Sequence, residues 1–111
     1  MYYIKAVILN DCSYSDAALL LLKKHNIKHN IITVNYNNMN NYRTNQINTF
    51  PQLYLKKQNE NGNLLLGGHD DFKKFIDTFK NKKYSEDNVK KFMKEYNWSK
   101  KACLRLIELL L

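Results

Sequence analysis

The chain has 111 residues, of which 44% are hydrophobic, and carries 18 Lys and Arg against 10 Asp and Glu. This size and apolar content predict one folded domain with a sizeable core, and they exclude a disordered tail and a two-domain enzyme. Two widely separated cysteines exclude the disulfide framework of a small secreted protein, and no apolar run approaches the ~20 residues that span a bilayer. The first residues, MYYIKAVIL, lack the features of a signal peptide. We therefore expect a cytoplasmic protein with no membrane partner.

The net charge of +8 would attract anions in general, nucleic acid included. However, only Arg43 and Arg105 are arginines, the residue type best suited to reading phosphates and bases, and no nucleic-acid-binding motif is present. A solvated surface of dispersed lysines is the simpler interpretation. Nucleic acid is therefore a disfavoured partner.

The first third of the chain has a strand–helix–strand pattern. Residues 2–9 (YYIKAVIL) are aromatic and β-branched, which predicts a buried strand. Residues 16–26 (DAALLLLKKHN) predict a helix, with Ser13 or Ser15 as its cap and Asp16 in its first turn. Residues 27–34 return to β-branched content and predict a second strand. A crossover of this length implies that the two strands are parallel.

The rest of the chain predicts a hairpin and several helices. The Asn-rich residues 35–48 predict a short helix around 40–47. Residues 51–57 (PQLYLKK) and 63–68 (NLLLGG) flank a polar, Gly-containing loop, as in a hairpin. Residues 70–80 (DDFKKFIDTFK) predict an amphipathic helix, and residues 85–111 predict two more that are interrupted near 97–99.

Cys12 lies where the first strand ends and the first helix begins. The N–H groups and the dipole of a helix start favour the nucleophilic thiolate, while the adjacent Asp11 opposes it. The alternative is a buried, inert cysteine that fills space. Position alone leaves both interpretations open.

Pro51 is the only proline and begins a strand-like run, TFPQLYL. A proline is tolerated at the first position of a strand. The alternative is a cis bond beside Cys12, which would turn the backbone of Phe50 outward so that an extended peptide can pair with it.

The segment GGHDDF, residues 67–72, combines two glycines with two aspartates at a helix start. Glycines allow a ligand to approach the backbone closely, free N–H groups can hold a carboxylate, and the Asp70 and Asp71 side chains can hold an ammonium. A plain helix cap is the alternative.

Taken in this order, CSYS (residues 12–15), TFPQLYL (49–55) and GGHDDF (67–72) resemble the glutaredoxin family of the thioredoxin fold, over residues 3 to about 80. The resemblance implies an α/β fold with a central four-stranded mixed sheet flanked by helices. Residues 1–82 would form the glutaredoxin-like domain, and residues 83–111 a C-terminal helical extension packed on it. The apolar end, residues 109–111, could instead mediate self-association, so a homodimer is left open.

The resemblance also implies roles for individual residues. Cys12 would be the catalytic nucleophile that forms a mixed disulfide with glutathione, the co-substrate. The residues that would bind glutathione are Tyr14, Phe50, Pro51, Gly68, His69, Asp70 and Asp71, with His69 contributing mainly its backbone.

This chain departs from the family pattern near the cysteine. The lysine usual three residues before the cysteine is Leu9 here, so its salt bridge to the glycine carboxylate of glutathione is either lost or made instead by Arg43 or Lys5. The proline usual after the nucleophile is Ser13, and the second cysteine is Ser15. The motif is thus of the monothiol type, in which a second glutathione supplies the missing thiol.

These features predict a glutathione-dependent thiol–disulfide oxidoreductase that acts on glutathionylated or disulfide-containing proteins. The alternative is a carrier that holds a [2Fe–2S] cluster between two subunits, with active-site cysteines and glutathione thiols as ligands. That branch of the family carries Cys-Gly-Phe-Ser, from which CSYS departs. Cys103 lies among apolar residues at helical spacing, and we expect it to pack rather than react.

Overall fold

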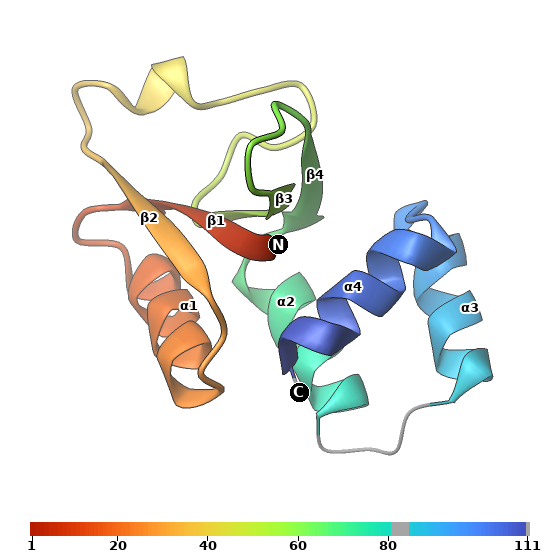
Figure 1. The fold of residues 1–111 in the computed structure, drawn as a ribbon. Coiled ribbons are helices and arrows are strands. Elements are labelled where there is room, and N and C mark those ends of the chain that lie inside the picture. The colour runs from red at the N-terminus through yellow and green to blue at the C-terminus, as the bar shows by residue number, and fades with distance from the viewer. Residues whose placement is uncertain (81–84, 111) are drawn as a thin grey trace.

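The computed structural model describes residues 1–80 and 85–110. In chain order the elements are β1 (Tyr2–Leu9), α1 (Ser13–Lys24), β2 (His29–Val34), a 3-10 turn η1 (Met39–Asn41), β3 (Gln52–Lys57), β4 (Asn63–Gly67), α2 (His69–Phe79), α3 (Glu86–Tyr96) and α4 (Lys100–Leu110) (Figure 1). None of the described helices is long and apolar enough to cross a membrane.

The four strands form one mixed sheet in the order β2-β1-β3-β4. β1 pairs with β2 in parallel and with β3 antiparallel, and β3 pairs with β4 antiparallel. The predicted parallel pair and the predicted hairpin are therefore both confirmed. This topology puts β1 and β3 in the middle of the sheet, and the carboxyl end of β1 leads directly to Cys12.

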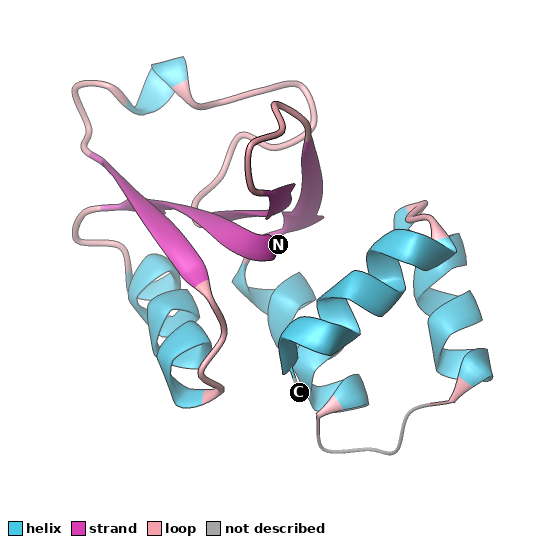
Figure 2. Cartoon of the chain, viewed as in Figure 1, coloured by secondary structure: helices cyan, strands magenta, loops and turns pink. Residues whose placement is uncertain are grey.

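The alternation of side chains along β1 separates two apolar clusters. Ile4, Ala6 and Ile8 point into the larger cluster, together with α1 residues such as Leu22. Val7 and Leu9 point into the smaller cluster on the opposite face. Helices α1, α2 and α4 lie on the side of the larger cluster (Figure 2). Because successive residues of a strand face opposite sides, the sheet itself lies between the two clusters.

The segment between β2 and β3 covers the other face of the sheet, where Met39, Tyr42 and Phe50 belong to the smaller cluster. The helix predicted around residues 40–47 is wrong, because only η1 forms there. Side chains supply the reason. The Asn35 carboxamide oxygen accepts hydrogen bonds from the backbone of residues 37 and 38, and the Thr44 hydroxyl accepts from those of residues 46 and 47. Such local bonds compete with helical ones.

Helices α3 and α4 pack on α2, and α4 also packs on β1 of the sheet. Phe92 of α3 meets Phe75 of α2 edge-on, with ring centroids 5.5 Å apart. The α4 residues in the larger cluster are Cys103, Leu106, Ile107 and Leu110. The expected boundary between residues 82 and 83 falls within 81–84, outside the described residues, as does Leu111. Leu110 is buried and Leu109 packs against the same cluster.

Candidate active site

Cys12 occupies the N-cap position of α1. Its backbone is extended, with φ −112° and ψ 118°, and its carbonyl accepts a hydrogen bond from the Asp16 N–H at 3.0 Å. The half-buried thiol donates to the Phe50 carbonyl oxygen, with 3.9 Å between sulfur and oxygen. The sulfur therefore lies at a helix N-terminus and beside the segment that precedes β3.

The expectation that Ser13 or Ser15 caps α1 is wrong. Ser13 is the first residue of the helix, and no side chain caps the N-terminus. Ser15 is fully buried, and its hydroxyl oxygen accepts a 3.0 Å hydrogen bond from the Leu9 N–H at the end of β1. The residue that replaces the second cysteine therefore satisfies a buried backbone donor and fixes the turn that carries Cys12.

The peptide bond between Phe50 and Pro51 is cis, the second of the two alternatives for this proline, and the contact of Phe50 with the Cys12 sulfur places it beside the cysteine. Gln52 follows and is buried. Its side-chain nitrogen donates to the Tyr42 carbonyl at 2.9 Å, and its oxygen accepts from the Tyr54 hydroxyl at 3.2 Å. Gln52 thus ties the long segment before Pro51 to the sheet.

Gly67 and Gly68 have different roles at the end of β4. Gly67 has a φ of +119°, and a Cβ there would lie 2.8 Å from the Cβ and Cγ of Asp71. A Cβ at Gly68 would meet only the Pro51 carbonyl oxygen, at 3.5 Å. Position 67 therefore needs glycine because Asp71 packs against it, whereas position 68 has room for a methyl group.

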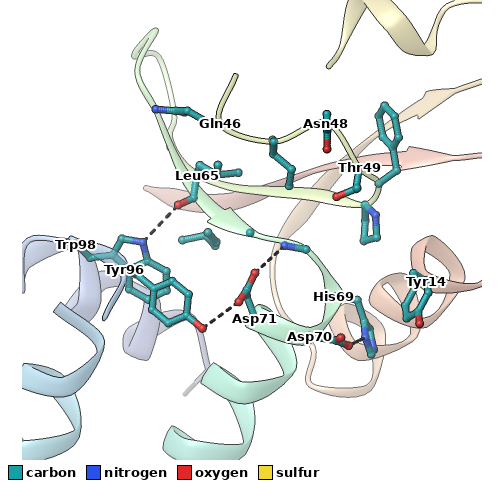
Figure 3. Close-up of a pocket in the computed structure, with 16 residues that line it drawn as sticks. Tyr14, Gln46, Asn48, Thr49, Leu65, His69, Asp70, Asp71, Tyr96 and Trp98 are labelled. Carbon is teal, nitrogen blue, oxygen red and sulfur yellow. Dashed lines mark hydrogen bonds and ion pairs between the residues drawn. The ribbon is translucent and has the colours of Figure 1, made fainter. Parts of the chain in front are cut away.

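The two aspartates of GGHDDF have distinct surroundings. Asp71 Oδ2 accepts from the Gly68 N–H at 3.3 Å, and Asp71 Oδ1 accepts from the Tyr96 hydroxyl at 3.0 Å (Figure 3). The Asp70 side chain is 87% exposed, with its Oδ1 2.9 Å from His69 Nδ1. Asp71 is thus held in one orientation at the floor of the site, and Asp70 faces solvent.

One pocket of about 730 Å³ joins these parts, within the size range of small-molecule sites. It contains every predicted glutathione contact except Arg43. The lining residues are Tyr14, Gln46, Ile47, Asn48, Thr49, Phe50, Pro51, Leu65, Leu66, Gly67, Gly68, His69, Asp70, Asp71, Tyr96 and Trp98. Cys12 is not among them, and its sulfur meets the rim of the pocket at Phe50.

No lysine or arginine lines this pocket within the described part of the chain. Leu9 is buried in the smaller cluster. Arg43 donates to the Asn40 side chain at 2.9 Å, and the Lys5 ammonium lies 5.6 Å from the centre of the Tyr54 ring. Neither expected replacement for the usual lysine therefore contributes to the pocket. The rim from Gln46 to Thr49 offers neutral polar groups instead.

Sequence reasoning missed the wall that the C-terminal extension provides. The Trp98 indole N–H donates to the Leu65 carbonyl at 3.3 Å, and the Trp98 and Tyr96 rings stack with centroids 4.8 Å apart (Figure 3). The available signal was small: a single tryptophan at the break between two helices. The neighbouring residues do not indicate which strand the Trp98 side chain contacts.

The largest pKa shifts near the site and in the core are those of Tyr96 and Cys103. Burial raises the pKa of the Cys103 thiol to about 11, because the charged form has no solvation among apolar neighbours. The pKa of Tyr96 is also raised, first by burial and then by its hydrogen bond to Asp71 and by the nearby negative charges. Both groups are therefore neutral at physiological pH. Among residues 1–80 and 85–110, no three His, Cys, Asp or Glu side chains gather as metal ligands.

A mixed four-stranded sheet, a cysteine at the N-cap of α1 and a cis proline before β3 together define a thioredoxin-like fold of the glutaredoxin type. The comparison with solved structures agrees. The chain is similar to glutaredoxin 1 from Francisella tularensis, crystallised in complex with cacodylate, with a TM-score of 0.53 and 22% identity; the match covers 74% of this chain and 100% of that one. No protein-family model and no curated protein matches the sequence. The likeness therefore establishes the fold.

Proposed function

We propose that the protein is a glutathione-dependent thiol–disulfide oxidoreductase that removes glutathione from protein mixed disulfides through Cys12. The observation that carries this proposal is the pocket next to the Cys12 sulfur. It gathers seven of the eight residues expected to bind glutathione, from three separate segments of the chain. Thiol exchange depends on access to the sulfur and on which sulfur is attacked, and a pocket beside Cys12 would control both.

The reaction consists of two exchanges at sulfur. The Cys12 thiolate attacks the glutathionyl sulfur of a protein–glutathione disulfide; the old S–S bond breaks, and the protein thiolate leaves and takes up a proton. The thiolate of a second glutathione then attacks the glutathionyl sulfur on Cys12. Glutathione disulfide leaves, and the Cys12 thiolate is regenerated. The sulfur lies at the N-terminus of α1, where the first N–H groups of the helix have no intrahelical partner and can face an anion.

The pocket offers a partner for each part of glutathione. The Phe50 backbone before Pro51 would pair with the cysteinyl unit, and the exposed Tyr14 ring would flank the sulfur. The first N–H groups of α2 would hold the γ-glutamyl carboxylate, with Asp71 close to its ammonium. The glycine carboxylate would then face the neutral residues Gln46 to Thr49.

A turnover assay with glutathione and a small mixed-disulfide substrate tests this function directly. We expect turnover by the wild-type chain, loss of turnover to background in Cys12→Ser, and activity within about twofold of wild type in Cys103→Ala, because Cys103 is buried and neutral. The Cys103 variant is the matched control for removal of a sulfur. Equal loss in both variants would contradict the monothiol mechanism.

An absorption spectrum of the purified protein accompanies the assay. Visible bands of a [2Fe–2S] cluster, together with absent turnover, would support the carrier function in place of the oxidoreductase.

A further inference from the structure

We propose that Tyr96 positions the Asp71 carboxylate to receive the γ-glutamyl ammonium of glutathione, so that the C-terminal extension forms part of the binding site. This inference rests on the proposed function and deepens it. Tyr96 would be a positioning residue, since it acts on the ligand through Asp71.

The hydrogen-bond capacity of Asp71 leaves room for a ligand. An ionised carboxylate has about four lone-pair positions. Tyr96 occupies one on Oδ1 and the Gly68 N–H occupies one on Oδ2, which leaves one on each oxygen. Both oxygens are thus oriented by the protein, and each can still accept from an ammonium. Two fixed donors also reduce the side-chain freedom that binding would otherwise cost.

The Tyr96 hydroxyl is protonated at physiological pH and donates a hydrogen bond to Asp71. Its pKa lies above the ordinary value for tyrosine, because burial, the Asp71 bond and the charge of Glu95 all disfavour the phenolate. A neutral phenol donates its proton to the carboxylate and places no second negative charge beside it. The pocket therefore keeps a single oriented anion at this position.

Two neighbouring aromatic rings pack against the Tyr96 ring. It stacks with Phe92 at 5.5 Å and with Trp98 at 4.8 Å, and Trp98 is itself bonded to the Leu65 carbonyl. The Lys74 ammonium lies 5.9 Å from the Tyr96 ring centre. Figure 3 shows the Tyr96 hydroxyl pointing at Asp71 from the far wall of the pocket. These contacts hold the Tyr96 hydroxyl at hydrogen-bonding distance from Asp71 Oδ1.

Calorimetric titration of the full chain with S-methylglutathione tests the inference without thiol chemistry. The control ligand is N-acetyl-S-methylglutathione, which has an uncharged amide where glutathione has its ammonium. We expect Tyr96→Phe to bind S-methylglutathione about tenfold more weakly than wild type and the acetylated ligand with unchanged affinity. Tyr36→Phe, which removes a hydroxyl from an exposed ring beyond the opposite sheet edge, should match wild type with both ligands.

A second measurement separates positioning from general damage. In an Asp71→Asn background, Tyr96→Phe should have no further effect on binding of S-methylglutathione, because the charge that it orients is gone. Equal weakening of both ligands by Tyr96→Phe, tighter binding, or an undiminished effect in the Asp71→Asn background would each overturn the inference. A wild-type chain that does not bind S-methylglutathione would overturn it as well. Binding that follows the expected pattern without any turnover would instead overturn the proposed oxidoreductase function and leave the role of Tyr96 standing.

Discussion

Ser15, at the position of the second cysteine in a dithiol motif, has a structural role in place of a redox one. Position 15 is where a dithiol protein would carry its second sulfur, but here a buried hydroxyl accepts the Leu9 N–H. Without that acceptor the N–H at the end of β1 would be buried and unpaired. The local geometry of the cysteine turn therefore depends on an oxygen at this position.

We predict that Ser15→Ala lowers the free energy of unfolding by about 1–3 kcal/mol, the usual cost of an unsatisfied buried donor. Ser13→Ala is the matched control, because Ser13 is exposed on the same helical turn and should change stability by no more than about 0.5 kcal/mol. Urea denaturation of both variants measures the difference. Equal stability of the two variants would show that water satisfies Leu9 instead.

Cys103 predicts a pH dependence of stability. Its pKa in the folded chain is raised by burial to about 11, above its ordinary value of 9.0. The unfolded chain therefore loses this proton first as pH rises, so the contribution of Cys103 to stability is complete below about pH 9 and is lost as pH approaches 11. The full loss is about 2–3 kcal/mol at 1.36 kcal/mol per unit.

Urea denaturation at pH 8 and at pH 10.5 tests this prediction. Wild type should lose more stability between the two values than Cys103→Ala does. The pKa values of Tyr54 and Tyr96 are raised as well, so the variant should still become less stable at alkaline pH, but by a smaller amount. Parallel losses in both proteins would argue against a buried neutral thiol.

The segment between β2 and β3 is the part of the fold that the sequence predicted least well. The strands and the long helices were predictable, because apolar periodicity dominates there. In residues 35–48, Asn and Thr side chains form hydrogen bonds with nearby backbone groups. Such bonds compete with helical ones, so the helix propensity of these residues is a poor guide to their structure. This irregular segment nevertheless carries the rim of the pocket from Gln46 to Pro51.

Gln52 is the attachment point of that segment, and we predict that Gln52→Leu raises the KM for glutathione about three- to tenfold. Loss of the amide releases the Tyr42 carbonyl and so loosens the rim that precedes Pro51. Stability should also fall by about 1–3 kcal/mol. Gln58→Leu, in the exposed turn after β3, is the control and should leave KM unchanged. A KM that rises in Gln58→Leu but not in Gln52→Leu would show that Gln52 does not hold the rim of the pocket.

At the scale of the whole molecule, the ordered motifs CSYS, TFPQLYL and GGHDDF were sufficient to predict the fold and seven lining residues of the pocket. They carried no information on the contacts from Tyr96 to Asp71 and from Trp98 to Leu65, which join positions 25 and 33 residues apart. Helical periodicity in residues 85–111 indicates an apolar face but not the partner of that face. Only the three-dimensional arrangement shows that the extension reaches the site.

We propose that residues 1–82 and the extension 83–111 unfold as one cooperative unit, and Phe92→Ala tests this. Phe92 is buried between Phe75, Phe79 and Trp98, so its truncation should cost about 3–5 kcal/mol. Thermal unfolding followed by circular dichroism should show a single transition at lower temperature. Two separate transitions, with the sheet melting at the wild-type temperature, would show that the extension is an independent unit.

The sheet that separates the two apolar clusters also determines which disulfides the protein can form. Cys12 packs against the smaller cluster, Cys103 is fully buried in the larger one, and position 15 holds no sulfur. The folded chain therefore cannot form an internal disulfide. Any disulfide at Cys12 must include a second molecule. Under the proposed function, the disulfide form of the protein would always be a mixed disulfide with another molecule, and its return to the free thiol would follow the supply of small thiol around it.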